Sequence, residues 1–179
     1  MSKARLATES QSLIGLSKMS SIGTAPIYEY ERGLNCSWLE CADSRMSTGS
    51  THSVLSSCST LVSAVSGNDT ISAQDGDDIV DGEDGNDSVD GGSGADSIRG
   101  GAGDDTLLGS NDADALDGGN GNDSLDGGSS VDSLIGNAGN DTLLGGLGAD
   151  TLHGGDGNDE LDGGYNNDSI LGGLGDDKI

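Results

Sequence analysis

A single aliphatic residue recurs at every ninth position through the last two-thirds of the chain, separated mostly by glycine and polar residues. The recurring residues are Ile71, Val80, Val89, Ile98, Leu107, Leu116, Leu125, Leu134, Leu143, Leu152, Leu161, Ile170 and Ile179. Only the middle side chain of a three-residue strand points inward. The spacing therefore predicts short strands that each give one side chain to a thin core between two sheets.

One weaker repeat precedes this series. Val62 keeps the aliphatic register, but Thr60 stands where the later repeats have aspartate. We therefore expect one additional strand at residues 61–63.

An aspartate stands two residues before each aliphatic position from Ile71 onward, without a miss. These residues are Asp69, Asp78, Asp87, Asp96, Asp105, Asp114, Asp123, Asp132, Asp141, Asp150, Asp159, Asp168 and Asp177. Glycines fill much of the remaining frame, typically as GGxGxDxUx, where U is aliphatic and the positions are numbered 1 to 9. Such glycines permit the positive φ and close backbone approach of a tight turn.

The repeats over residues 67–179 resemble those of the RTX (hemolysin-type) family, whose nonapeptides bind calcium. The resemblance implies an all-β fold, a parallel β-roll or right-handed β-helix. In this fold GGxGxD forms each turn, xUx forms each strand, and two repeats complete one coil. It also implies Ca²⁺ between turns stacked on the same edge, with all thirteen aspartates as candidate metal ligands.

The charge of the chain lies entirely in the repeats. Residues 67–179 hold 25 Asp and 2 Glu against Arg99 and Lys178, which accounts for the whole net charge of −25. Phosphate repels such a surface, so general nucleic-acid binding is excluded. A solvated acidic tail and a cation binder remain, and the preference for Asp over Glu favours the cation binder. Carboxylates stacked about 4.8 Å apart repel by roughly 3 kcal/mol, so the roll needs cations.

Calcium fits the residue types better than other metals. Ca²⁺ accepts carboxylates and backbone carbonyls in irregular geometry, whereas Mg²⁺ demands a strict octahedron and Zn²⁺ prefers His and Cys. The chain has only His52 and His153, neither in an HExxH motif, and GxSxG is also absent. We expect no enzymatic activity and a solvated His153.

The turns fall into two sets that differ in sequence. The first edge has turns ending at Asp69, Asp87, Asp105, Asp123, Asp141, Asp159 and Asp177, all with Gly at position 4 and Asn or Asp at position 5. The second edge has turns ending at Asp78, Asp96, Asp114, Asp132, Asp150 and Asp168, and there Asp112, Ser130 and Asn166 replace the position 4 glycine. Two interpretations stay open: weaker metal sites on the second edge, or neutral drift.

Residues 1–60 form a polar, Ser- and Thr-rich segment without sustained periodicity, followed by the roll at 61–179. We expect this segment to be largely disordered, apart from a candidate strand at 27–30. Cys36, Cys41 and Cys58 match no zinc spacing. Three reduced thiols are the default for them, and a disulfide with one free thiol is the alternative.

Targeting features are sparse. No apolar run is long enough to span a membrane, and no cleavable N-terminal signal is evident. Family resemblance implies export by a type I system and an extracellular location. The sequence stops at Ile179 inside a repeat, which favours a fragment or a truncated reading frame.

Two functions are consistent with these features. The first is a calcium-binding module that folds on binding Ca²⁺ and has a structural or interaction role with an unidentified protein or surface. The alternative is the repeat region of a type I-secreted protease, lipase or hemolysin-like toxin whose catalytic domain is absent.

Overall fold

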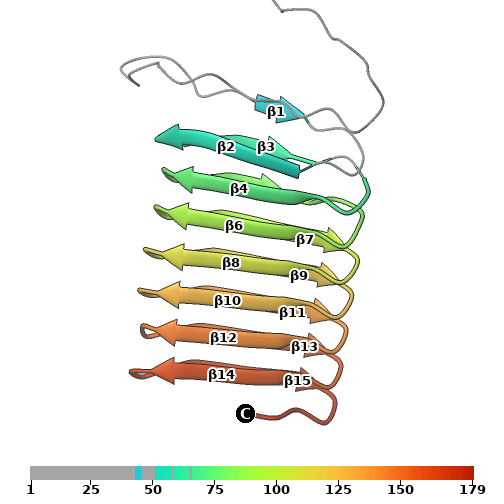
Figure 1. Ribbon diagram of the computed structural model, residues 1–179. Helices are drawn as coiled ribbons and strands as arrows, with labels where there is room; N and C mark the ends of the chain where they lie inside the picture. The colour runs from blue at the N-terminus through green and yellow to red at the C-terminus, as the bar shows by residue number, and fades with distance from the viewer. Residues whose placement is uncertain (1–42, 46–50, 58, 65) are drawn as a thin grey trace, which may run out of the picture.

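The computed structural model describes residues 43–45, 51–57, 59–64 and 66–179, which form a parallel β-solenoid of about six turns (Figure 1). The candidate strand at 27–30, all three cysteines and the aromatic residues before Tyr165 lie outside the described residues. No helix long and apolar enough to cross a membrane occurs in the described part of the chain.

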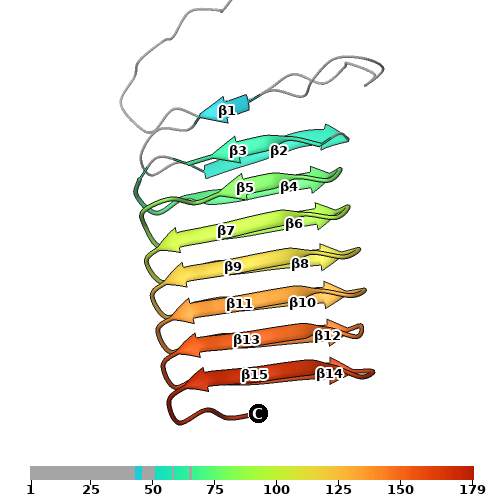
Figure 2. The same ribbon diagram turned by 180° about the vertical axis from the view of Figure 1, so that it is seen from behind.

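The described strands alternate between two parallel sheets (Figures 1 and 2). One sheet has the order β1 (Asp43–Arg45), β3 (Leu61–Ser63), β5 (Ile79–Asp81), β7 (Ser97–Ala102), β9 (Ala115–Asn120), β11 (Ser133–Ala138), β13 (Thr151–Asp156) and β15 (Ser169–Leu174). The other has the order β14 (Glu160–Tyr165), β12 (Thr142–Leu147), β10 (Ser124–Ser129), β8 (Thr106–Asn111), β6 (Ser88–Ser93), β4 (Thr70–Asp75) and β2 (Thr51–Ser57).

Pairing within each sheet joins residues that are 18 apart, so two nonapeptides complete one coil. Leu125 of β10 pairs with Leu143 of β12, and Leu134 of β11 pairs with Leu152 of β13. The first edge therefore joins each strand of the β1–β15 sheet to the next strand of the other sheet, and it lies on the right in Figure 1. The second edge makes the return connection.

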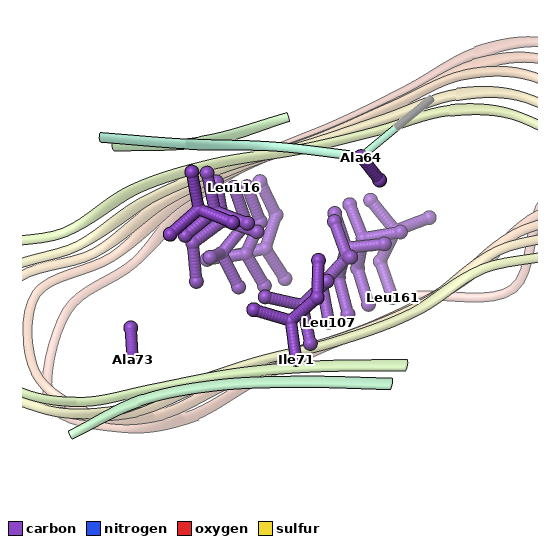
Figure 3. Packing of buried hydrophobic residues seen from close by; sticks show 14 residues of the cluster. Ala64, Ile71, Ala73, Leu107, Leu116 and Leu161 are labelled. Carbon is purple, nitrogen blue, oxygen red and sulfur yellow. The ribbon is translucent and has the colours of Figure 1, made fainter. Parts of the chain in front are cut away.

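The recurring aliphatic side chains form the core, as predicted. They stack in two columns between the sheets (Figure 3). From Ile71 to Leu161 each is at most 3% exposed. Val62 is fully buried in β3, which confirms the additional strand at 61–63.

The aliphatic prediction was wrong at the last position. Ile170 is only partly buried, and Ile179 is 73% exposed. Each belongs to the final coil, where no further coil stacks on it. Two other core members, Ala64 and Ala73, were not predicted because they stand at position 1, which is glycine in the later repeats.

Most strands are longer than the three residues expected. From β6 onward each spans six residues, and the glycines that follow the aliphatic residue continue the ladder, as Gly128 and Gly146 do. Glycine lacks a side chain to pack but keeps both backbone hydrogen-bonding groups, so it can pair in a parallel ladder. The turns consequently shrink to about three residues.

Two strands in the N-terminal segment were not predicted. β1 pairs with β3, and β2 pairs with β4 through a register shift between Ser53 and Ser56. Neither strand carries the nonapeptide pattern, so the period gave no signal for them.

Candidate metal sites

The predicted metal ligands line the inside of the turns at both edges of the solenoid. Each of these ligands from Asp69 to Asp159 is buried, with 1–3% of its surface exposed. Asp168 and Asp177 are half-buried because they lie in the final coil. The structure therefore brings the aspartates into two stacked rows, one behind each set of turns.

One carboxylate oxygen of each stacked aspartate from Asp87 onward accepts a hydrogen bond from the aspartate one coil earlier. Asp123 Oδ1 accepts the backbone N–H of Asp105 at 2.8 Å, and Asp141 Oδ1 accepts that of Asp123 at 2.8 Å. The same bond recurs along both rows with donor–acceptor distances up to 3.1 Å. This ladder was not predicted, because the nonapeptide period does not specify which backbone group each carboxylate meets.

The other carboxylate oxygen has no hydrogen-bond partner through most of the array. This is true of Oδ2 in Asp78, Asp87, Asp96, Asp105, Asp114, Asp123, Asp132, Asp141, Asp150 and Asp159. Buried polar atoms are almost always paired, and an unpaired buried charge is strongly unfavourable. The repetition of the same unpaired atom in successive turns points to a ligand of positive charge.

A backbone carbonyl faces the same space as this oxygen. A Cβ on Gly82 would lie 2.5 Å from both Asp87 Oδ2 and the Gly100 carbonyl oxygen. At Gly109 the corresponding distances are 2.5 Å to Asp114 Oδ2 and 2.8 Å to the Gly127 oxygen. We call each such pair of oxygens beside a position 1 glycine a cradle.

The cradle recurs with both oxygens at seven position 1 glycines. These are Gly82, Gly100, Gly109, Gly127, Gly136, Gly145 and Gly154. Carboxylate and carbonyl oxygens are the ligands that Ca²⁺ prefers. The residues present therefore fit a calcium ion, and glycine at position 1 keeps the space open.

The first two repeats differ at this position. Ala64 and Ala73 are buried there, so a methyl group takes the place that the later glycines leave open. Asp78 also has a protein partner of its own, since its Oδ1 accepts both the N–H and the hydroxyl of Thr60 at 2.6 Å. The cradles therefore begin with Asp87, although the aspartate period begins at Asp69.

Burial raises the pKa of eight of the turn aspartates. Desolvation is the largest cause, and neighbouring carboxylates add to it, while the hydrogen bond from the preceding coil opposes it. The pKa rises to about 7 for Asp105 and Asp114 and to about 6 for Asp96 and Asp141. Burial also raises the pKa of Asp78, Asp87, Asp123 and Asp132. The turns thus disfavour their own negative charge unless a cation accompanies it.

Other metal chemistry finds no support in the described ranges. No group of three or more His, Cys, Asp or Glu side chains gathers there around one point. His153 is exposed on β13, as expected of a solvated histidine. Each cradle combines carboxylate with backbone oxygen, which suits a hard cation and not Zn²⁺.

Comparison with known families agrees with this geometry. The model of the RTX calcium-binding nonapeptide repeat, which spans four copies, matches residues 63–98, 90–125, 117–152, 126–161 and 144–179. No curated protein matches the chain. The matched segments together span residues 63–179, which begin at the last residue of β3.

Proposed function

Because this chain belongs to the RTX calcium-binding nonapeptide repeat family, we propose that its solenoid folds when Ca²⁺ binds and then serves a structural or interaction role. The unpartnered Oδ2 atoms of the turn aspartates support this proposal most directly. They are buried, they repeat every nine residues, and no Lys or Arg side chain among the described residues forms an ion pair with them.

The proposed ligands are the aspartates and carbonyls of the cradles. Asp87, Asp105, Asp114, Asp132, Asp141, Asp150 and Asp159 each share a cradle with the carbonyl of a position 1 glycine one coil further on. Bound Ca²⁺ would supply positive charge and accept six to eight oxygen ligands. The Oδ1 ladder holds each carboxylate in place, so that Oδ2 stays directed into the turn.

Coupling to folding follows from the charge of the repeats. Residues 67–179 hold 27 acidic and 2 basic residues, so the coils repel one another when they stack. A cation that binds only the stacked turns shifts the equilibrium toward the folded solenoid. Each coil contacts only its neighbours, so order gained at one turn favours order at the next.

An extracellular location belongs to the same proposal. RTX repeats are typical of type I-secreted proteins. Extracellular Ca²⁺ is millimolar, and sites in extracellular modules commonly bind in that range. The chain would then stay unfolded where Ca²⁺ is scarce and fold after export.

Circular dichroism of the full chain at neutral pH tests the proposal. We expect a coil spectrum in EDTA, a β spectrum in millimolar CaCl₂, and return to coil when EDTA is added again. MgCl₂ at the same ionic strength is the control, and it should leave most of the chain unfolded. Equal β content in EDTA and Ca²⁺, or full replacement of Ca²⁺ by Mg²⁺, would contradict the proposal.

A further inference from the structure

The turns on the two edges of the solenoid differ in backbone conformation at position 4. On the first edge every position 4 residue is glycine, with φ between 108° and 146°. On the second edge Asp112, Ser130 and Asn166 have φ of 72°, 96° and 84°, while φ of Gly148 lies outside the left-handed range. A non-glycine residue with positive φ is strained. The structure therefore holds these three residues in the region of positive φ that favours glycine.

The hydrogen bond that the position 4 N–H donates to the next coil also differs between the edges. From Gly67 to Gly157, the N–H of each first-edge glycine donates to a carbonyl of the next coil at 2.7–2.9 Å. On the second edge the bond from Ser130 to Leu147 measures 2.6 Å, and that from Gly148 to Tyr165 measures 3.4 Å. The first edge is regular, and the second edge varies from turn to turn.

A second hydrogen-bond ladder is continuous along the first edge only. At position 5 the side-chain oxygen of one Asn or Asp accepts the backbone N–H of the next, as Asn122 does from Asn140 at 2.9 Å. This bond recurs without interruption from Asn68 to Asp176, at 2.8–3.2 Å. We call it the outer ladder.

The second edge lacks the side chains for such a ladder over most of its length. Its position 5 residues include Ala95, Ala113, Val131 and Ala149, none of which has an acceptor. Only Asp77 forms the equivalent bond there, to Ala95 N–H at 3.0 Å. The first-edge turns are therefore linked coil to coil by groups that take no part in the cradles.

Replacement of glycine at position 2 occurs on both edges and does not distinguish them. Glu83 and Asn137 on the first edge, and Gln74 and Ser110 on the second, all replace glycine at positive φ. Drift acting equally on all turns explains that distribution. The losses at positions 4 and 5 are confined to one edge and need another cause.

Both edges nevertheless retain the buried carboxylates. Asp114 and Asp132 on the second edge, like Asp105 and Asp123 on the first, are at most 3% exposed and have an unpartnered Oδ2. The second edge is thus a set of sites with the same charge but less preorganised turns. A ligand that must order its own site binds more weakly than one that meets a preformed site.

We infer that the chain has two classes of calcium site, with the first edge binding more tightly and filling before the second. This inference rests on the proposed calcium function and concerns the order in which the same sites fill. The strain at position 4 and the missing outer ladder lead us to expect a difference of about tenfold in Kd.

An NMR titration of the ¹⁵N-labelled full chain with CaCl₂ resolves the edges. The folded-state amide signals of Gly121 and Gly139 should appear at about tenfold lower Ca²⁺ than those of Asp112 and Ser130. If the folded signals of both edges appear together at one Ca²⁺ concentration, the inference is wrong while the proposed function stands. If no folded signals appear at any Ca²⁺ concentration, the proposed function itself fails.

The double variant Ser130→Gly/Val131→Asn gives one second-edge turn the first-edge pattern. The new asparagine can accept the N–H of Ala149, as Asn122 accepts that of Asn140. The amide at position 130 should then appear at lower Ca²⁺, while that of Gly76, three coils away on the same edge, serves as the internal control. An unchanged midpoint at position 130 would overturn the inference.

A pair of single variants tests the outer ladder independently of the engineered turn. Asn122→Ala removes the acceptor for Asn140 and should raise the Ca²⁺ midpoint at Gly139. Asn167→Ala changes the same position of a second-edge turn, where the exposed side chain makes no hydrogen bond in the described structure, and should leave its edge unchanged. Equal shifts from the two variants would contradict a role for the ladder.

Discussion

The strands and the turns of this solenoid each bury one side chain per nonapeptide, but the two side chains meet very different surroundings. The strand buries an aliphatic residue between two like residues of the adjacent coils, as Leu125 lies between Leu107 and Leu143. The turn buries an aspartate whose Oδ1 is bonded and whose Oδ2 is not. The buried groups of the strand core thus find all their partners within the protein, whereas the turn carboxylate lacks a partner for Oδ2.

This difference assigns separate roles to the two regions. Aliphatic burial favours stacking under all conditions and supplies the register of the coils. The buried carboxylates oppose stacking until a cation reaches them. Because the core is thin, with one aliphatic side chain per repeat, the charge state of the turns decides whether the folded solenoid is stable. Folding can therefore respond to calcium.

The largest single-site effect is expected in the strand core. Leu125→Ala should lower the free energy of unfolding of the calcium-loaded chain by about 2–5 kcal/mol, because it removes apolar burial and leaves a cavity. Chemical denaturation at saturating Ca²⁺ measures the loss. The Ca²⁺ midpoint for folding should rise in parallel, because each coil depends on its neighbours.

Leu144→Ala is the matched control for this variant. Leu144 follows Leu143 on the outer face of β12 and is 38% exposed, against 1% for Leu125. The substitution should change the free energy of unfolding by about 0.5 kcal/mol or less. Equal losses from the two variants would show that the inward register assigned to the strands is wrong.

A smaller effect is expected from pH in the absence of calcium. The folded-state pKa is raised to about 7 for Asp105 and Asp114 and to about 6 for Asp96 and Asp141, above the ordinary value near 3.8. The folded state therefore binds more protons than the unfolded state between about pH 4 and pH 7. Stability from protonation is fully present below about pH 4 and is lost as pH rises through 6 to 7.

Circular dichroism in EDTA across this range measures the effect. In EDTA the β signal should rise as pH falls from 7 to 4. In a separate Ca²⁺ titration, the Ca²⁺ concentration at the folding midpoint should also rise as pH falls, because protons compete with Ca²⁺ for the carboxylates. A β signal in EDTA that falls on acidification would show that the turn carboxylates do not oppose folding.

The nonapeptide period predicts the parts of this structure that repeat. The two aliphatic columns and the strand at 61–63 follow from the spacing of Leu125, Leu143 and their equivalents, whereas the 18-residue coil was implied by the resemblance to the RTX family. The stacking of the turn aspartates in two rows follows once the coil is known, since every eighteenth residue takes the same place in its coil.

Features that depend on pairing between particular atoms were not predictable. A period does not show that Asp123 Oδ1 binds Asp105 N–H while Oδ2 faces the Gly118 side of the turn. It also does not show that glycines at strand ends continue the ladder, or that Ala64 and Ala73 fill the space kept open elsewhere. The strands β1 and β2 pair through backbone groups, which any sequence without proline can supply.

The most direct test of the difference between strands and turns is to remove the charge of one turn carboxylate and measure the change in folding stability with and without Ca²⁺. Asp105→Asn keeps an oxygen that can accept the Asp87 N–H, removes the charge, and places an amide nitrogen toward the Gly118 carbonyl beside Gly100. In EDTA at pH 8, with sucrose added until the wild-type chain is half folded, the variant should be more stable by about 1–3 kcal/mol. In Ca²⁺ it should be less stable than the wild type and bind less calcium.

Asp156→Asn is the control, because its exposed side chain on the first edge loses the same charge without altering a cradle. The measurement is the folded fraction by circular dichroism in the two conditions. The effect of Asp105→Asn on stability should change sign between EDTA and Ca²⁺, whereas the effect of Asp156→Asn should not. Destabilisation by Asp105→Asn in both conditions, or the same response from both variants, would contradict it.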